Sequence, residues 1–289
     1  MVNVNPLKGF RDFYPKEKGV QNFVFKKIRE VAKLLGCEEY DGPVVEPMEL
    51  YLNKTSKELI DKQTFKIQDK NNNILVLRPE MTPTLARMVA NKTQNIIFPT
   101  KLFNIGLRYR YEAPQKGRER EFYQMDFDIL GSDSLISDAE SIYTAIKIFQ
   151  VFGSSDKDFV LYINSRSEME KCLLKLGFDK KLFGKLFKII DKQDKINNKT
   201  FVNLLLSIEK DRTKVNALVN FLYTKRVEKS EYFNQLFQLL KEYRIYQYCQ
   251  INYNITRGFD YYTGLVLKLG KKGRSSWREL CLEEEDTTT

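Results

Sequence analysis

The segment 107–131 carries the residues whose types and spacing are best suited to chemistry. It predicts two strands joined by a turn at Pro114 and Gly117, because bulky and charged side chains alternate along both of its arms. One face of this antiparallel hairpin would be apolar, and the other would bear Arg110, Glu112, Gln124, Asp126 and Asp128. Such a polar face suits a charged ligand, whereas the alternative is a face that only meets water.

The composition excludes several kinds of site. The chain of 289 residues contains no histidine, so imidazole catalysis and histidine-ligated metals are excluded. Its four cysteines lie far apart without a CxxC pair, which argues against a zinc site and a disulfide framework. The net charge of +10 makes polyanions suitable partners. No apolar run approaches the ~20 residues that span a bilayer, and no signal peptide is present, so we expect a cytoplasmic protein.

A long helix and several strands must position the polar face. Apolar residues recur at helical spacing over residues 16–35, and Gly36 suits the end of that helix. A proline-bearing extended segment follows at 42–47. Residues 64–78 predict a hairpin around four polar turn residues.

A second helix is predicted directly after that hairpin. Thr82 suits its N-cap, with Pro83 at the first helical position. A cap explains Thr82 without any ligand. It does not explain Glu80, which lies where the strand becomes a helix.

Residues 165–248 differ in character from the strand-rich part before them. They contain three apolar stripes at helical spacing, a pattern typical of a helical core. We therefore predict a core at 1–164, an inserted all-helical module at 165–248, a return to the core at 249–269 and an aberrant tail at 270–289. The lysines of the module either contact RNA or form a solvated face.

Four stretches together resemble the histidyl-tRNA synthetases, a family of class II aminoacyl-tRNA synthetases. Residues 110–124 resemble motif 2 of that family, and residues 8–47 resemble motif 1. The stretch LRPEMTPTLAR at 77–87 resembles the segment that holds the amino group of histidine, and 254–264 resembles the histidine-specific signature. The resemblance implies an α+β fold, with a class II synthetase-like antiparallel sheet flanked by helices.

The resemblance also implies a reaction and its participants. Members of the family join histidine to ATP, release pyrophosphate, and transfer histidine to tRNA(His). The implied partners are therefore L-histidine, ATP and tRNA(His), with Mg²⁺ brought by ATP rather than held in a protein cage. Motif 1 implies a homodimer.

Individual residues receive roles by the same resemblance. Arg110 would bind the α-phosphate and the histidine carboxylate, and Arg257 would stabilise the charge from the opposite side, as always-ionised arginine is suited to do. Asp128, which stands where the family commonly has glutamate, would contact the imidazole together with Tyr262. The implied histidine-binding residues are Glu80, Met81, Thr82, Arg110, Gln124, Asp128, Arg257, Tyr261 and Tyr262. The implied ATP-binding residues are Arg110, Glu112, Arg118, Arg120 and Phe122.

The resemblance ends near Leu267. The family's glycine-rich strand, motif 3 and anticodon domain have no counterpart in the residues that follow. One hypothesis is that the residues after about Leu269 are a frameshifted reading of the missing segment. On that hypothesis, residues 277–289 would be disordered or lie without a partner strand.

Three functions stay open from the sequence. The first is a histidyl-tRNA synthetase catalytic domain, incomplete in this chain. The second is a paralogue that does not aminoacylate, such as the regulatory subunit of ATP phosphoribosyltransferase. The third is a non-catalytic RNA-binding module, which only the positive charge supports.

Overall fold

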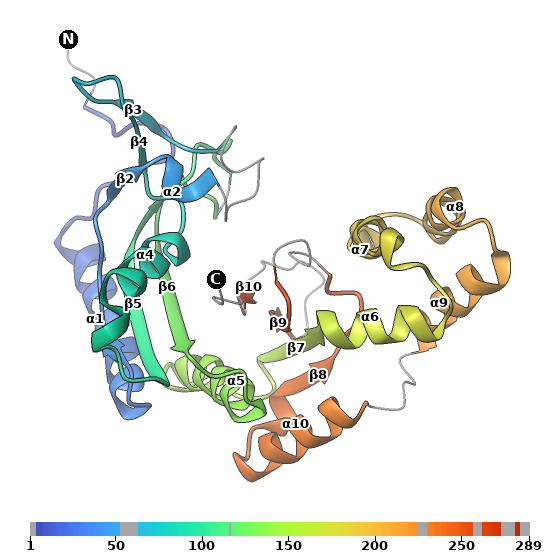
Figure 1. Ribbon diagram of the computed structural model, residues 1–289. Helices are drawn as coiled ribbons and strands as arrows, with labels where there is room; N and C mark the ends of the chain where they lie inside the picture. Colours follow the sequence, from blue (N-terminus) through green and yellow to red (C-terminus); the bar gives the residue numbers. More distant parts are fainter. Residues whose placement is uncertain are drawn as a thin grey trace. The chain divides into compact units, whose positions relative to one another are not determined.

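The computed structural model describes residues 4–52, 63–115, 117–224, 230–256 and 262–272, together with the backbone of residues 281–283. The chain divides into two compact units, Met1–Ser132 and Asp133–Thr289. Helices and largely antiparallel sheets occur in both units, which confirms the predicted α+β class (Figure 1). In the part of the chain that is described, no helix combines the length and the apolar character that crossing a bilayer requires.

The described residues of the first unit form two three-stranded sheets instead of one continuous sheet. The order of one is β1-β5-β6, in which β1 and β5 are parallel, and the order of the other is β2-β4-β3. Its strands are β1 (Glu38–Glu39), β2 (Val45–Pro47), β3 (Lys66–Gln68), β4 (Ile74–Leu77), β5 (Thr100–Tyr109) and β6 (Glu121–Leu130). Its helices are α1 (Pro15–Leu34), α2 (Glu49–Leu52), α4 (Thr82–Lys92) and the 3₁₀ turn Thr93–Asn95.

The long hairpin of β5 and β6 has the predicted alternation of faces. Asn104 pairs with Asp126 and Gly106 with Gln124, so these residues share one face, whereas Phe103 pairs with Phe127 on the other. The first strand lies nearer the N-terminus than the sequence predicts, because it runs from Thr100 to Tyr109 and does not reach residue 112. Beyond Tyr109 the backbone turns.

Helix α1 packs against the apolar face of this hairpin. The ring of Phe25 lies 4.9 Å from that of Tyr123, centroid to centroid, and Ile28 is buried. Gly36 has φ +74°, the left-handed conformation that commonly ends a helix, as predicted. Val20 and Phe23 are exceptions to the predicted apolar stripe, because they are 61% and 54% exposed.

The predicted N-cap of α4 is wrong by one residue. The helix begins at Thr82, and Met81 is its N-cap, without a capping side chain. The Met81 carbonyl accepts the first helical hydrogen bond from Leu85, at 2.9 Å. Met81 takes this position because its side chain is buried, 1% exposed, and therefore fixes the entry of the chain into the helix.

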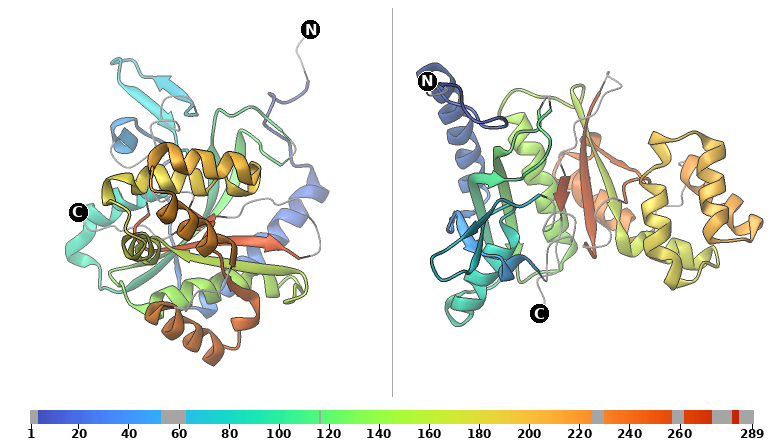
Figure 2. Two further views of the ribbon diagram at one scale, coloured as in Figure 1. Left: turned by 90° about the vertical axis from the view of Figure 1, so that its right-hand side faces the viewer. Right: turned by 90° about the horizontal axis from the view of Figure 1, so that it is seen from above.

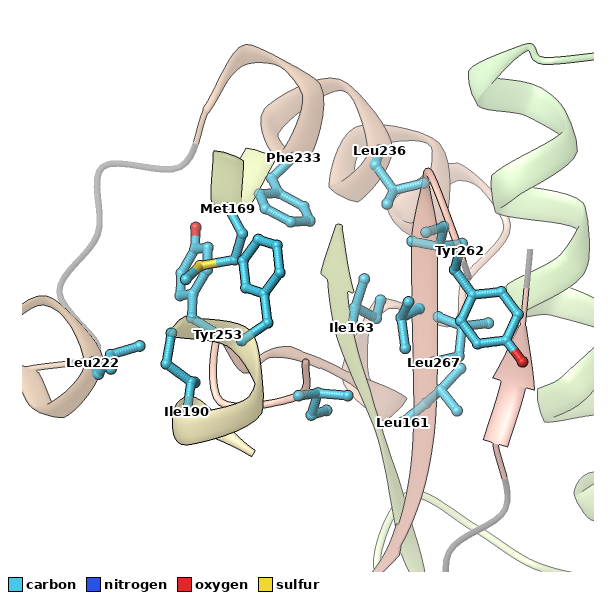
Figure 3. Packing of buried hydrophobic residues seen from close by; sticks show 14 of the residues in the cluster. Leu161, Ile163, Met169, Ile190, Leu222, Phe233, Leu236, Tyr253, Tyr262 and Leu267 are labelled. Carbon is cyan, nitrogen blue, oxygen red and sulfur yellow. The ribbon is translucent and has the colours of Figure 1, made fainter. Parts of the chain in front are cut away.

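The second unit is built around strand β7. Its four-stranded sheet has the order β10-β9-β7-β8, in which β7 and β8 are parallel and the other pairs antiparallel. Leu161 and Ile163 of β7 are fully buried and pack with Met169 and Phe233 from neighbouring helices (Figure 3). Its strands are β7 (Phe159–Ser165), β8 (Cys249–Ile251), β9 (Leu265–Lys271) and β10 (Cys281–Glu283).

Helices fill the chain between β7 and β8, as predicted. In Figure 2 the helices α7 to α9, yellow to gold, gather beside the strands of the same unit. The three predicted apolar stripes lie in or against the core cluster of the unit. The helices are α5 (Leu135–Gln150), α6 (Arg166–Lys175), α7 (Phe183–Ile190), α8 (Asn198–Ile208), α9 (Arg212–Thr224) and α10 (Glu231–Glu242), with 3₁₀ turns at Lys180–Leu182, Gln193–Lys195 and Tyr246–Tyr248. The division of the chain at residues 164 and 248 stays a prediction.

The expectation of an unpaired tail is wrong for residues 281–283. These residues form strand β10, in which Leu282 pairs with Leu267 of β9. Strand β9 pairs with β7 along one edge. Its other edge presents backbone N–H and C=O groups, and β10 pairs with that edge. The rest of the tail from residue 273 lies outside the described residues.

Candidate functional site

Two buried arginines lie beneath the polar face of the hairpin. Arg78, at the end of β4, is 2% exposed, and Arg108 of β5 is fully buried. Arg78 donates from Nη1 to the Asp41 carboxylate at 2.8 Å and to the Gly42 carbonyl at 2.7 Å, and from Nε to the Leu107 carbonyl at 3.0 Å. It therefore ties the loop after β1 to strand β5.

Arg108 begins a chain of hydrogen bonds along the polar face. Its Nη2 donates to Asn104 Oδ1 at 2.8 Å and also to Asp126 Oδ2. The other oxygen of Asp126, Oδ1, accepts from Gln124 Nε2 at 2.7 Å. Asp126 thus uses both carboxylate oxygens within the protein, and the amide of Gln124 is held with its Oε1 directed away from Asp126.

Gly106 makes room for this arrangement. A Cβ atom at this position would lie 2.6 Å from Arg78 Nη2, 2.9 Å from Arg108 Nη1 and 2.9 Å from Asn104 Oδ1. Real side chains do not tolerate such distances, so only glycine lets the two guanidinium groups pass over the strand here.

Asp128 is the next residue along the same face of β6. Its Oδ2 accepts a hydrogen bond of 3.1 Å from the Tyr40 hydroxyl. Burial and the neighbouring charge of Asp126 raise the pKa of Asp128 to about 7, although the Tyr40 hydrogen bond and Arg108 act in the opposite direction. Burial and the nearby carboxylates also raise the pKa of Tyr40, so its phenol stays protonated and donates.

Arg110 lies just past the end of β5 and is partly exposed. Its Nε donates to the Pro79 carbonyl at 3.1 Å, and its guanidinium carbon lies 5.4 Å from the centre of the Phe122 ring. One side of the guanidinium is therefore fixed by protein contacts. The Nη groups of Arg110 have no hydrogen-bond partner among the described residues, so they can bind a carboxylate or phosphate in the planar fork typical of arginine.

The turn between β5 and β6 carries a second group of charges. Arg118 Nη1 lies 3.5 Å from Glu112 Oε2, and Arg120 donates from Nε to the Glu112 carbonyl at 3.1 Å. The Arg120 guanidinium also lies 4.2 Å from the centre of the Tyr111 ring. Arg118 is exposed, so it can exchange its ion pair with Glu112 for an anionic ligand at little cost.

The segment from β4 to α4 brings three more predicted site residues into the first unit. Glu80 and Thr82 are partly buried at the start of α4. Met81 is buried, and its sulfur accepts from Arg78 Nη1 at 3.6 Å. Met81 is therefore part of the framework around Arg78.

The predicted residues of the histidine signature belong to the second unit of the chain. Tyr262 belongs to the second unit, where it is buried in the core cluster (Figure 3). Arg257 and Tyr261 lie outside the described residues. Both ends of their segment are held by the end of β7: Asn164 donates to the Ile255 carbonyl at 2.8 Å, and Arg166 Nη1 to the Tyr262 carbonyl at 3.1 Å.

Sequence reasoning assigned no role to four residues that shape the site. Arg78, Arg108 and Asp126 form its buried network, and Tyr40 contacts Asp128. Alternation along β5 places Arg108 on the same face as Gly106 and opposite to Tyr109, but it does not reveal which residues Arg108 contacts. Tyr40 carries no such signal, because it is 88 residues from Asp128 in sequence.

The arrangement suits an amphoteric ligand with a polar ring. Arg110 can bind an anionic group, Gln124 Oε1 can accept from an ammonium, and Asp128 can accept from a ring N–H. Within the described part of the chain, no group of three or more cysteine, aspartate or glutamate side chains is placed to hold a metal ion.

Comparison with known proteins gives matches over nearly the whole chain. A family model described as Histidyl-tRNA synthetase matches residues 9–276. The chain is 33% identical over 291 aligned positions to the chloroplastic/mitochondrial histidine--tRNA ligase of Arabidopsis thaliana, covering 97% of this chain and 60% of that protein. It is 35% identical to the histidine--tRNA ligase of Leptospira biflexa, covering 91% of this chain and 63% of that protein. The chain thus spans about 60% of the length of these curated relatives.

Solved structures share the fold at lower identity. A structure described as an ATP phosphoribosyltransferase regulatory subunit/histidyl-tRNA synthetase from Bacillus halodurans C has a TM-score of 0.81 at 21% identity and covers 96% of this chain and 75% of that one. Histidyl-tRNA synthetase from Nostoc sp. PCC 7120 has a TM-score of 0.78 at 22% identity and covers 93% of this chain and 65% of that one. At these identities the two structures establish the fold alone, and it is the class II synthetase fold expected from the sequence.

Proposed function

Because this chain belongs to the histidyl-tRNA synthetase family, we propose that it carries the catalytic site of a histidine--tRNA ligase. In the first step the carboxylate of histidine attacks the α-phosphate of ATP, which forms histidyl-adenylate and releases pyrophosphate. In the second step histidine passes to tRNA(His). The observation that carries the proposal is the polar face of β5 and β6, where Arg110, Gln124 and Asp128 present three complementary groups.

Arg110 stabilises the negative charge that develops at the α-phosphate in the first step. Its Nε is fixed, and its Nη groups have no hydrogen-bond partner among the described residues, so they suit binding of the histidine carboxylate and the α-phosphate together. Arg257 would act on the same phosphate from the opposite side, as the resemblance implies. A preorganised donor of this kind contributes about 10²–10³ in rate, because it needs no rearrangement when the charge appears.

Histidine is recognised at both of its ends. Gln124 accepts from the α-ammonium group through Oε1, because its amide nitrogen already donates to Asp126. Glu80 and Thr82 complete that end, and Met81 supports the segment that carries them. Asp128 would bind the imidazole, and the resemblance implies that Tyr262 contacts the other ring nitrogen and that Tyr261 forms a wall of the pocket.

ATP binds over the turn of the hairpin. Arg118 and Arg120 neutralise its phosphates, and Glu112 and Phe122 contact the nucleotide, as the resemblance implies. Mg²⁺ enters with ATP, since that ion keeps several waters and binds through phosphates more readily than in an all-protein cage.

The remaining partners rest on the resemblance and on exposed surface. A homodimer would form through the motif 1 region, which is supported by the exposure of Val20, at 61%, and of Phe23, at 54%, on α1. The acceptor end of tRNA(His) would reach the same site. The protein would act in the cytoplasm.

Pyrophosphate exchange tests the proposal. Labelled pyrophosphate should enter ATP when the chain is supplied with L-histidine and Mg²⁺, and not when glutamine replaces histidine. Absence of histidine-dependent exchange by folded protein would contradict a catalytic role of this chain.

A further inference from the structure

We infer that Tyr40 is a positioning residue for histidine, because its hydroxyl holds one oxygen of Asp128 and leaves the other for the substrate imidazole. The inference rests on the proposed function, since it takes Asp128 as the residue that meets the ring. Tyr40 lies within the stretch that resembles motif 1, but it is not among the residues to which the resemblance gives a role in binding histidine or ATP. Only the fold brings Tyr40 to Asp128, because the two residues are 88 positions apart in sequence.

The backbone of Tyr40 is fixed on both sides. Its N–H donates to the Phe103 carbonyl at 3.0 Å, and its carbonyl accepts from Asn104 Nδ2 at 2.6 Å. Tyr40 directly follows β1, and Asp128 lies on β6, two strands away in the order β1-β5-β6. Two strand spacings amount to about 10 Å, a span that a tyrosine and an aspartate side chain can just close together. A shorter residue at position 40 would not reach.

Asp128 has no other hydrogen-bond partner among the described residues. The residue opposite it on β5 is Leu102, which offers no polar group. Asp126, two residues away on the same face, already uses its oxygens for Arg108 and Gln124. Tyr40 is therefore the one described side chain that fixes the carboxylate of Asp128, and Oδ1 stays available to a ligand.

Electrostatics makes this contact sensitive to pH. The ionisable groups facing Asp128 are Asp126 on its own strand, Arg108 on β5 and Tyr40 after β1. Burial and Asp126 raise the pKa of Asp128 to about 7, while Tyr40 and Arg108 restrain the rise. An ionised Asp128 accepts hydrogen bonds from Tyr40 and from the imidazole N–H at once. A protonated Asp128 can accept fewer hydrogen bonds, so its protonation competes with the binding of histidine.

The test is the Tyr40→Phe variant, in which the ring and both backbone contacts are kept. Histidine binding to the whole chain is measured by calorimetry from pH 6 to pH 8.5. Loss of the hydroxyl should raise the pKa of Asp128 by about one pH unit, so binding weakens about tenfold near pH 6. The two proteins should converge near pH 8.5, where Asp128 is ionised in both.

Two further variants separate positioning from general damage. Tyr246→Phe removes the hydroxyl of a tyrosine that is 50% exposed, and it should bind histidine like the unsubstituted chain at every pH. Asp128→Asn removes the titrating group. In that background, Tyr40→Phe should leave no pH-dependent difference, because the two residues act through one contact.

The outcomes are distinct. A loss of affinity that is equal at all pH values would mean that Tyr40 only supports the fold, and it would overturn the inference. Unchanged binding, or tighter binding near pH 6, would also overturn it. If the unsubstituted chain itself fails to bind histidine, the proposed function fails with it, which is a different result from a defect confined to Tyr40→Phe.

Discussion

Arg108 reaches back along its own strand to Asp126, which pairs across the hairpin with Asn104 and not with Arg108. The guanidinium can take this path because Gly106, which lies between Asn104 and Arg108, has no side chain. The result is a fully buried arginine whose charge is compensated by a carboxylate, and that carboxylate in turn orients Gln124. A framework residue thus determines which atom of Gln124 stays available to a ligand.

Gly106→Ala should destabilise the protein. The added Cβ would displace Arg78 Nη2, Arg108 Nη1 or Asn104 Oδ1, and the hydrogen bonds of Arg78 and Arg108 restrict any such movement. We expect the free energy of unfolding to fall by about 1–3 kcal/mol, measured by urea denaturation.

Gly19→Ala is the matched control for this prediction. Gly19 lies in α1, and a Cβ added there would meet no atom of a neighbouring segment within 4 Å. Alanine there should increase stability by about 0.5–1 kcal/mol through helix propensity. Equal effects of the two substitutions would contradict the packing argument at Gly106.

Arg110→Ala should slow adenylate formation strongly while the fold is kept. The side chain is partly exposed and contributes one hydrogen bond to the Pro79 carbonyl. Its removal therefore weakens binding of the ligand's negative charge more than it disturbs packing. Histidine-dependent pyrophosphate exchange should fall by about 10²–10³. Arg110→Lys should recover only part of the activity, because an ammonium group lacks the planar fork.

Arg212→Ala serves as the control for Arg110. Arg212 is an exposed arginine at the start of α9, and its removal should leave exchange unchanged. Near-normal exchange by Arg110→Ala would mean that the wrong role has been given to this arginine.

Much of the fold follows from local patterns in the sequence. Alternation along residues 107–131 predicts the hairpin and its two faces, because a strand has a period of two residues. Helical periodicity likewise predicts the stripes of α7, α9 and α10, whose residues lie in or against the core. These patterns act within one element, so they can be found without knowing its neighbours.

The buried polar network could not be predicted in the same way. Arg78 and Arg108 are among the largest fully buried side chains, although arginine is rarely buried unless it is paired. Their partners are distant in sequence: Arg78 donates to Asp41, and Arg108 to Asp126. The resemblance gives Arg110 a role because this residue belongs to a motif. The role of Arg108 in the network follows only from its contacts in the folded chain.

Asp128→Asn should change how stability depends on pH. A carboxyl whose pKa is raised on folding binds more protons in the folded state, so it lowers stability as pH rises from its unfolded value near 4 through about 7. Asparagine cannot titrate, so the variant should gain stability relative to the unsubstituted chain over this range. We expect a relative gain of at least about 1 kcal/mol between pH 4 and pH 7.5 from urea denaturation.

Asp133→Asn gives the comparison for that measurement. Asp133 is an exposed aspartate just after β6, so the same substitution there should cause no comparable change in the pH profile of stability. If Asp128→Asn and the unsubstituted chain have parallel stability profiles, the carboxyl of Asp128 titrates at an ordinary pKa.

The central claim is that this chain binds L-histidine, and a thermal unfolding experiment tests it most directly. L-histidine at about 1 mM should raise the unfolding temperature, because a ligand that binds only the folded state stabilises it. Histidinol, which lacks the carboxylate for Arg110, should have a smaller effect, and glutamine should have none. No shift with L-histidine in a sample shown to be folded would contradict the account.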